Sequence, residues 1–428
     1  MQKETLRAVP AASAIGLLDM LHEIRPDLPK PVIAGLIIDE SAYYRDNKDV
    51  QRAGVPAARH YFQYGEKEKR KYSHPKIAFS KTLSSDPVKQ GKVVYYTSAT
   101  EDNPSWLYRC VFPFKKSEFS TDHIFFSGTN LLSRLILGVF TAKKVVFMRP
   151  IYTTTTVYLV QLCRRIGVEV EFDYDDLLLP EYARQRGACR SGLRPHKDDF
   201  SESLKQSSLT MQADSFTCST KPIAFELKKI NSNVSVRVNK IPKSMFLDEK
   251  DILQRAKERA AAGGKLKILY LSGSNTHKRD FSTIVGPLTK IAQEFPDRFS
   301  VTFMGSLSDY SSVFNMIGVE SFMKPTVPFQ QMLEIIGQHD LVLVPLEFSV
   351  FNHCKSNIKY IESASQGVPV IASSVTEFSA AIKHGVNGWL CDDEHQWYET
   401  LKDLATNPAK AFSCGVSAFR HAKKEFSV

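Results

Sequence analysis

The feature that most constrains the fold is a rhythm of short apolar runs separated by stretches with helical spacing. It begins with KVVYYT at Lys92 and continues through DHIFFSG, KKVVFMR, VEVEFDYDD, ADSFTCST and VSVRVN. It restarts near Leu266 with KLKILYLSG, FSVTFMGS, ESFMKPTVP, HDLVLVPLE, GVPVIASS and GWLC. Such alternation is typical of βαβ units and of parallel sheets buried on both faces. The sequence therefore predicts two doubly wound α/β domains, with ligands in the cleft between them, beyond the carboxyl ends of the strands.

Chain length and the change in the spacing of apolar residues suggest where the domains divide. The chain has 428 residues, which is long for a single core when a domain averages ~150 residues. Residues 1–85 show helical spacing without strand alternation, so we expect a helical N-terminal extension there. Rossmann-like domains are expected over 86–240 and 241–410, and a C-terminal helix over 411–428 is a candidate to cross back to the N-terminal domain. A charged interval at 181–206 is expected to be a partly helical loop near the cleft.

Charge and cysteine content exclude several classes of function. The net charge of +10 is spread over small clusters, such as EKEKRK (66–71) and HAKKEF (421–426). We interpret these clusters as solvated surface, with weak contact to anionic lipid head groups as the alternative. Zinc-finger, RNP-like and basic-helix patterns are missing, so nucleic acid is not an expected partner. The seven cysteines never form a CxxC pair, which disfavours a disulfide framework or a zinc site.

Targeting signals point to the cytoplasm. No apolar run approaches the ~20 residues that a membrane span needs. The short apolar patch near the N-terminus is followed by Asp19, Glu23 and Asp27 where a signal peptide needs small residues. We therefore expect a cytoplasmic protein, with peripheral attachment to the inner face of the membrane as an extension of that prediction.

The turn after the apolar run ILYL combines small residues with cations. Its sequence is SGSNTHKRDF, and its notable residues are Ser272, Gly273, Ser274, His277, Lys278 and Arg279. Small residues let backbone N–H groups approach a phosphate at a helix start, and nearby cations neutralise its charge. The pattern predicts a phosphate-binding turn; an ordinary βα turn with exposed charges is an equally good alternative.

A second motif follows the apolar run LVLVPL. The stretch FNHCKSNIKYIESASQGVPVIASS (351–374) predicts a helix that Asn352 or Ser356 caps and that Gly367 ends. Because this helix would begin at the carboxyl end of a central strand, we expect one face of it to point into the cleft.

Three charged residues of this helix have the spacing of one helical face. Lys355, Lys359 and Glu362 are separated by four and then three positions. A ligand-facing role is favoured, and a solvated charge stripe worth a few tenths of a kcal/mol is the alternative.

Together these motifs resemble the nucleotide-sugar half of glycosyltransferase family 4, which has the GT-B fold. The similarity rests on PLEFSVFNHCKSNIKYIESASQGVPVIAS (345–373), with HDLVLV before it and HGVNGWL after it. FDYDDLLLP (172–180), ADSFTCSTKPIAFEL (213–227) and VRVNKIP (236–242) are similar to acceptor-domain and crossing segments of the sub-group that builds bacterial capsule and O-antigen. Residues 43–70 resemble a short module found beside such transferases, for which a packing or interaction role is favoured over catalysis.

The resemblance implies a retaining, metal-independent glycosyltransferase of hexosyltransferase type. It would need no cofactor, and would move a sugar from a nucleotide-diphosphate sugar to a saccharide or lipid-linked acceptor. The implied setting is surface polysaccharide synthesis, which includes capsule and lipopolysaccharide, with other polysaccharide-assembly enzymes as partners. A GT-B-fold binding or scaffold subunit without turnover is the alternative.

The resemblance also assigns roles to single residues. Basic groups and a helix N-terminus would stabilise the departing diphosphate, and the catalytic residues implied are Lys355, Glu362, Lys278 and Arg279. Glu362 matches the second of two signature glutamates, the one near the ribose. Cys354 stands eight positions earlier, where the first is expected. The implied nucleotide-sugar contacts are Ser272, Gly273, Ser274, His277, Lys324, Val327, Asn352, Cys354, Ser356 and Asn357.

The acceptor side is less marked in the sequence. Its candidates are Asn103, Trp106, Arg109, Arg149, Asp173, Asp175 and Asp176. For the three aspartates a structural or acceptor-binding role is favoured over a metal clamp. Arg149 is equally well explained as a cleft residue and as a buried partner of Asp173 or Asp175.

Overall fold

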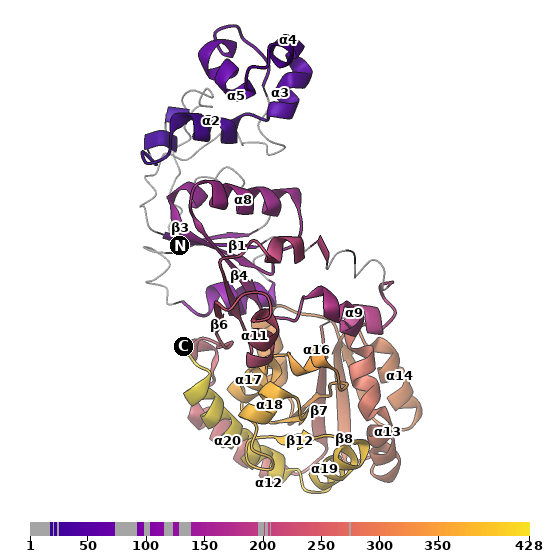
Figure 1. Ribbon diagram of the computed structural model, residues 1–428. Coiled ribbons are helices and arrows are strands. Elements are labelled where there is room, and N and C mark those ends of the chain that lie inside the picture. The colour runs from indigo at the N-terminus through magenta and orange to yellow at the C-terminus, as the bar shows by residue number, and fades with distance from the viewer. Residues whose placement is uncertain are drawn as a thin grey trace. The chain divides into compact units, whose positions relative to one another are not determined.

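The computed structural model describes residues 18–19, 21–23, 25–72, 92–97, 103–114, 123–127, 138–195, 201, 204–205, 207–273 and 275–428 (Figure 1). These residues form two compact units. The first contains the described residues of 1–101, 115–173 and 208–216, and the second contains those of 102–114, 174–207 and 217–428. No helix of the described residues is both long and apolar enough to cross a membrane.

The N-terminal region of the first unit is helical, as predicted. Its elements are α2 (Lys30–Ile37), α3 (Glu40–Asp46), α4 (Lys48–Arg52), α5 (Ala57–His60) and the π-helical turn η1 (Tyr61–Gly65). Gly65 is required where η1 approaches α3, because a Cβ there would lie 2.6 Å from the Tyr43 hydroxyl. That hydroxyl bonds to Nδ1 of His60 at 2.9 Å, which ties α3 to α5.

The first sheet contains the six strands predicted before residue 240. Along the chain they are β1 (Lys92–Thr97), β2 (His123–Ser127), β3 (Ala142–Met148), β4 (Glu169–Tyr174), β5 (Ser215–Cys218) and β6 (Val234–Val236). Their order across the sheet is β2-β1-β3-β4-β5-β6. Strand β1 pairs in parallel with β2 and β3, and β3 pairs in parallel with β4. Helix α8 (Thr154–Arg165) connects β3 to β4; the Thr153 hydroxyl accepts from the Thr156 N–H and caps it.

The second sheet contains the six strands predicted after residue 264, all parallel to their neighbours. Along the chain they are β7 (Leu266–Ser272), β8 (Phe299–Gly305), β9 (Ser321–Lys324), β10 (Leu341–Val344), β11 (Val370–Ser373) and β12 (Trp389–Cys391). Their order across the sheet is β12-β11-β10-β7-β8-β9. The order reverses between β7 and β10, and ligands of doubly wound sheets bind at such switch points. The loops after β7 and β10 are therefore the natural place for a site.

Helices cover both faces of the second sheet (Figure 1). On one face α12 (Glu249–Ala262), α15 (Phe329–Gly337), α17 (Ile358–Ser365) and α20 (Ala409–Glu425) pack against apolar side chains of β7, β10 and β11. On the other face α13 (Lys278–Glu294), α14 (Ser308–Met316) and α19 (Glu394–Thr406) pack against β7 and β8. Each fully buried Leu, Ile or Phe contributes about 1.5–3 kcal/mol, so the backbone that carries the site is firmly held.

The chain end belongs to the second unit. The N–H groups of Ile241 and Lys243 donate to the carbonyl groups of Phe426 and Val428. The predicted C-terminal helix is thus present as α20, and the residues after it pair with the segment that precedes α12.

The prediction of one helix that includes Lys355 and Lys359 is wrong. A short helix, α16 (Val350–His353), comes first, because Ser349 accepts from the Asn352 N–H and caps it. Its last N–H bonds are made at Cys354 and Lys355. Helix α17 then starts after Asn357, which makes no side-chain cap bond, so neither predicted cap residue acts as one.

The predicted end of this region is confirmed. Gly367 follows α17 with φ +70°, a conformation that favours glycine, and a Cβ there would lie 2.6 Å from the Ile252 side chain. Ile361 and Ala364 are buried against the sheet, as their spacing predicted.

Candidate functional site

The predicted phosphate turn follows β7 at the switch point. Ser272 is buried at the end of β7, and its carbonyl oxygen would lie 1.6 Å from a Cβ on Gly305, which has φ +104°. Gly273 is exposed, and Ser274 lies outside the described residues. A single 3-10 turn, η5 (Asn275–His277), leads into α13. The turn therefore ends at a helix N-terminus, as predicted.

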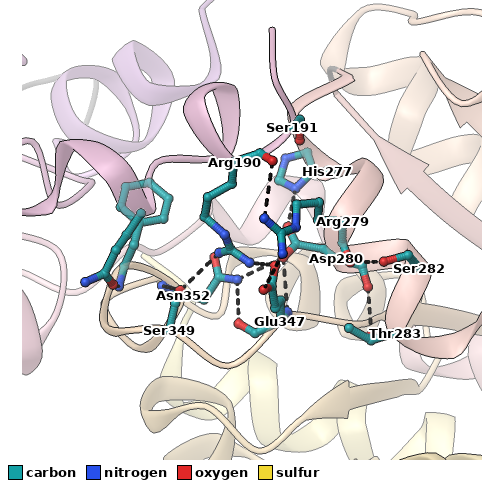
Figure 2. A network of polar contacts seen from close by, with 12 residues as sticks. Arg190, Ser191, His277, Arg279, Asp280, Ser282, Thr283, Glu347, Ser349 and Asn352 are labelled. Carbon is teal, nitrogen blue, oxygen red and sulfur yellow. Dashed lines mark hydrogen bonds and ion pairs between the residues drawn. The ribbon is translucent and has the colours of Figure 1, made fainter. Parts of the chain in front are cut away.

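Asp280, in the first turn of α13, ties the two loops of the switch point together (Figure 2). Its Oδ1 accepts from the Glu347 N–H at 3.1 Å and from Nδ2 of Asn352 at 2.8 Å, and its Oδ2 bonds to Nδ1 of His277 at 3.0 Å. Asp280 and Asn352 are both buried. Burial lowers the pKa of His277, partly offset by its bond to Asp280. Three bonds to one buried carboxylate fix the predicted phosphate turn relative to the loop after β10.

A second set of charges gathers on Glu347 (Figure 2). Its carboxylate makes ion pairs with the guanidinium groups of Arg190 and Arg279, the latter at 3.3 Å. Nη1 of Arg190 also donates to the Ser349 hydroxyl at 3.1 Å, and Nη1 of Arg279 donates to the Arg190 carbonyl at 3.4 Å. Burial lowers the pKa of Arg190. Two cations therefore share one carboxylate.

Arg190 reaches this place from the charged interval at 181–206, which is partly helical in its described residues. The interval begins within the 3-10 helix η3 (Pro180–Gln185) and contains helix α9 (Gly187–Arg190). The Ser191 hydroxyl donates to the Thr276 carbonyl at 3.0 Å, and Gln185 Oε1 accepts from the Phe351 N–H at 3.2 Å. This segment is packed on both loops of the switch point.

Glu362 is buried in the middle of α17. The Tyr108 hydroxyl donates to its Oε1 at 2.7 Å, and both residues are at most 6% exposed. Burial raises the pKa of Glu362 to about 7, although the Tyr108 bond and the charge of Lys359 oppose that rise. Burial also raises the pKa of Tyr108 well above its usual value. A carboxylate with a pKa near 7 in a buried site is a candidate functional group.

Lys359 lies one turn before Glu362 on α17. Its Nζ donates to the Leu271 carbonyl at 2.6 Å and lies 5.7 Å from the centre of the Tyr270 ring. Burial lowers the pKa of Lys359 to about 8, with Glu362 and Asp280 opposing the shift. The lysine thus reaches from α17 to the end of β7, beside the predicted phosphate turn.

Lys355 and Cys354 lie between α16 and α17. Nζ of Lys355 is 3.9 Å from Oδ1 of Asp176 and 4.8 Å from the centre of the Phe351 ring. Cys354 is 1% exposed, and burial raises its pKa to about 12. Its carbonyl accepts from the Thr220 hydroxyl at 3.0 Å. The thiol is therefore a neutral, buried group rather than an exposed contact.

The segment before α17 is held by a polar chain. The Ser356 hydroxyl accepts from Nδ2 of Asn239 at 3.1 Å, and Oδ1 of Asn239 accepts from Nη1 of Arg109 at 3.0 Å. Arg109 is fully buried, and it also donates to the Arg237 carbonyl. Asn357 is buried at the start of α17. Arg109, a predicted acceptor residue, thus bonds within the second unit.

The remaining predicted residues occupy separate places. Nζ of Lys324, at the end of β9, donates to Gln338 at 3.5 Å, and Val327 packs against the core of the second unit. Asn103 caps a short turn by accepting from the Ser105 N–H, and Trp106 is buried. Their binding roles stay predictions.

The other acceptor-side candidates are divided between the units. Arg149 and Asp173 belong to the first unit, where the Arg149 N–H donates to the Asp173 carbonyl at 2.9 Å. Asp173 is buried, and Arg149 has φ +45°. Asp175 and Asp176 belong to the second unit, and the Asp175 carbonyl accepts from the Ser219 hydroxyl at 3.1 Å.

Sequence reasoning missed four residues of the switch point: Tyr108, Arg190, Asp280 and Glu347. Asp280 lies in SGSNTHKRDF and Glu347 ends HDLVLVPLE. Their position just after predicted strands could have identified both as candidates. Tyr108 is 254 positions away from Glu362, and Arg190 is 159 positions away from Ser349, so no local spacing could have placed them there.

Comparison with known proteins finds a family likeness in the part of the chain that forms the second sheet. A family model described as "Glycosyl transferases group 1" matches residues 267–407, which run from β7 through α19. The D-inositol 3-phosphate glycosyltransferase of Thermobispora bispora is 31% identical over 104 residues, which are 24% of this chain. The match spans only 23% of that relative's length.

Solved structures show a likeness of fold over most of the chain. Anabaena Alr3699/HepE in complex with UDP and glucose has a TM-score of 0.53 at 12% identity, covering 79% of this chain and 96% of that one. The same protein in complex with UDP has a TM-score of 0.53 and covers 78% of this chain. The chain has the GT-B fold. The predicted fold is therefore confirmed, and the resemblance to group 1 glycosyl transferases is supported over residues 267–407.

Proposed function

We propose that this GT-B protein is a glycosyltransferase that takes its sugar from a nucleotide-diphosphate donor. The family match over residues 267–407 and the fold support this proposal. The observation that carries it is the buried Glu362 beside Lys359, next to the phosphate turn at the switch point of the second sheet. Ligands of such sheets bind at the carboxyl ends of the strands, where these groups lie.

The charges suit the chemistry of a departing diphosphate. Negative charge grows on the diphosphate as the sugar leaves, and preorganised cations stabilise that charge. Lys278 and Arg279 start α13, and Lys355 precedes α17. Glu362, when ionised, accepts hydrogen bonds, which suits the two hydroxyl groups of a ribose. Lys359 holds the turn in place through the Leu271 carbonyl.

The donor-sugar contacts differ from those of enzymes with two signature glutamates. Cys354 replaces the first glutamate, and its buried neutral thiol offers no carboxylate to a sugar. We retain the proposal of a retaining, metal-independent reaction with front-face departure, which rests on the resemblance of residues 345–373. The donor-sugar contacts must therefore come from other groups near the loop after β10.

The proposed acceptor is a saccharide or a lipid-linked saccharide used in surface polysaccharide synthesis on the cytoplasmic side of a membrane. The proposed domain division stays at residues 85, 240 and 410, with the N-terminal helices as a packing or interaction appendage. This part of the proposal rests on the sub-group resemblance of residues 172–180, 213–227 and 236–242.

A non-catalytic scaffold is the second candidate, and Cys354 is the observation in its favour. A scaffold would keep the fold and could lose a sugar-binding glutamate without consequence. The two candidates differ in turnover, because only the enzyme releases a nucleoside diphosphate.

The test is a panel of nucleotide sugars, with UDP-sugars first because Anabaena Alr3699/HepE was solved with UDP. We expect thermal stabilisation by at least one donor and release of its nucleoside diphosphate. Lys355→Ala and Glu362→Ala should abolish transfer in a folded protein, and Lys410→Ala, which breaks an exposed ion pair with Asp403, should not. If no nucleotide sugar binds at millimolar concentration, the transferase proposal fails; binding without release favours the scaffold.

A further inference from the structure

The ion pairs on Glu347 occupy the place where the proposed function needs free cations. Arg279 stands in the predicted phosphate turn, and its guanidinium faces the Glu347 carboxylate at 3.3 Å (Figure 2). Arg190 faces the same carboxylate from α9. Arginine binds carboxylates and phosphates with the same planar fork of donors. A carboxylate therefore sits where two guanidinium groups could bind a phosphate.

The two arginines and the glutamate differ in how firmly they are held. The Arg190 side chain is 10% exposed, and the Ser349 hydroxyl and the bond from Ser191 to Thr276 hold it and its helix in place. The Glu347 side chain is 28% exposed, and the next residue, Phe348, is 85% exposed. Of the two partners, Glu347 is thus the more exposed and Arg190 the more firmly held.

The backbone of Glu347 does not have to move with its side chain. Its N–H donates to Asp280 at 3.1 Å, and its carbonyl accepts from Nδ2 of Asn352 at 2.7 Å. Both partners are buried. A rotation of the Glu347 side chain therefore leaves the loop after β10 and the start of α13 in register.

We propose that Glu347 is an internal counter-ion that the donor's diphosphate displaces, and that Arg190 is a further ligand of this diphosphate. The inference deepens the proposed function and rests on it. Without donor, the carboxylate of Glu347 pairs with both guanidinium groups. A diphosphate carries more charge and more acceptor oxygens than a carboxylate, so it can satisfy both guanidinium groups once Glu347 turns away. Donor binding thus competes with an intramolecular ion pair.

A purely structural clasp is the alternative reading of the same contacts. In that case Arg190 and Glu347 only hold α9 on the loop after β10, and loss of either partner would loosen the site. Both substitutions would then change ligand affinity in the same direction. In the displacement account the two substitutions act in opposite directions, because one removes the competitor and the other removes a ligand.

The experiment is isothermal titration of the full chain with UDP and, separately, with inorganic pyrophosphate. We expect Glu347→Gln to bind three- to tenfold more tightly than the wild type and Arg190→Gln to bind three- to tenfold more weakly. Glu249→Gln breaks an exposed ion pair with Arg420 in the same unit and is the matched control, expected to stay within twofold. Weaker or unchanged binding by Glu347→Gln would overturn the inference.

A second variant protects the test against misfolding. Glu347→Asp keeps the charge but shortens the side chain, so it should also bind more tightly, by a smaller factor; weaker binding would again overturn the inference. Wild-type protein that binds neither probe overturns the inference as well. The proposed function is judged separately by the donor panel, since a wild type that transfers sugar while Glu347→Gln gains no affinity contradicts the inference alone.

Discussion

Two charged clusters near the switch point of the second sheet are built on opposite principles. In one cluster the carboxylate of Glu347 pairs with the guanidinium groups of Arg190 and Arg279. The side chains of Arg190, Arg279 and Glu347 are 10, 53 and 28% exposed. In the buried cluster, Glu362 bonds to the neutral Tyr108 hydroxyl and Lys359 to a backbone carbonyl. In the buried cluster, burial shifts the pKa of both Glu362 and Lys359 toward the neutral form.

The difference indicates a division of labour. We call Arg190, Arg279 and Glu347 the exposed cluster, because it is the more exposed of the two. In our proposal it exchanges one anion for another, which suits recognition of a diphosphate. The buried cluster cannot relax, and it holds a carboxyl group with a pKa near 7 and an ammonium group with a pKa near 8 in fixed positions. Fixed, partly ionised groups are sensitive to pH and to substitution. We therefore expect large effects in the buried cluster and small ones in the exposed cluster.

The largest expected effect is the loss of transfer in Glu362→Gln. An amide fills the same volume but brings an NH2 group toward the ribose hydroxyls and loses the carboxylate charge. We expect the transfer rate to fall on the order of 100-fold, as for other preorganised polar contacts in active sites. The measurement is release of nucleoside diphosphate by wild type and variant at saturating donor. Turnover within threefold of the wild type would move the site elsewhere.

The second effect is a pH dependence of folding stability caused by Glu362. Its pKa rises from 4.5 to about 7 on folding. A raised carboxyl pKa contributes stability that is complete below pH 4.5 and is lost as pH rises through 7. Relative to Glu362→Gln, the wild type should lose on the order of 3 kcal/mol over that window. Burial lowers the pKa of Lys359 from 10.5 to about 8. This lysine therefore contributes stability that is complete above pH 10.5 and is lost as pH falls through about 8.

Urea unfolding of both proteins at pH 4.5, 6 and 7.5 measures this difference. Parallel stability curves for wild type and Glu362→Gln across the window would show that Glu362 is not held in a costly ionised state.

A smaller effect is expected from Tyr108→Phe. The change removes the hydroxyl that donates to Glu362 and leaves a buried acceptor without that partner, which costs about 1–3 kcal/mol of unfolding free energy. The loss should be larger at pH 8, where Glu362 is ionised, than at pH 5. Phe112→Leu alters the ring that packs on Tyr108 without touching the hydrogen bond, so its cost should not vary with pH. Equal losses for Tyr108→Phe at both pH values would contradict the role of the bond.

The smallest effect on stability is expected from Arg279→Gln in the exposed cluster. Its side chain is 53% exposed, and ion pairs at such sites contribute at most about 1 kcal/mol. The melting temperature should hardly change, while affinity for the donor falls severalfold because one diphosphate ligand is lost. A melting temperature lowered as much as in Tyr108→Phe would erase the contrast between the clusters.

The sequence predicted much of this architecture because its signals are local. All twelve predicted strands are present, since each is a short apolar run that can be read without its neighbours. Gly367 could also be predicted locally, because the residue that ends a helix often has a positive φ, here +70°, which favours glycine. Fold class and the switch-point loops were therefore within reach of pattern and resemblance.

The details of the site depended on contacts that sequence spacing does not encode. Lys355 was predicted one turn before Lys359 on a single helix, but the Ser349 cap starts a separate short helix and leaves Lys355 outside α17. The pairing of Glu362 with Tyr108 joins residues 254 positions apart, and that of Arg190 with Ser349 joins residues 159 apart. Tertiary packing decides such pairs.

The central claim is that the loops after β7 and β10 bind the donor, and hydrogen exchange on donor addition tests it most directly. With a nucleotide sugar that the panel identifies, amide exchange should slow in residues 272–280 and 346–362 and stay unchanged in α2 to α5. Protection confined to other residues, with none in these two loops, would contradict the claim.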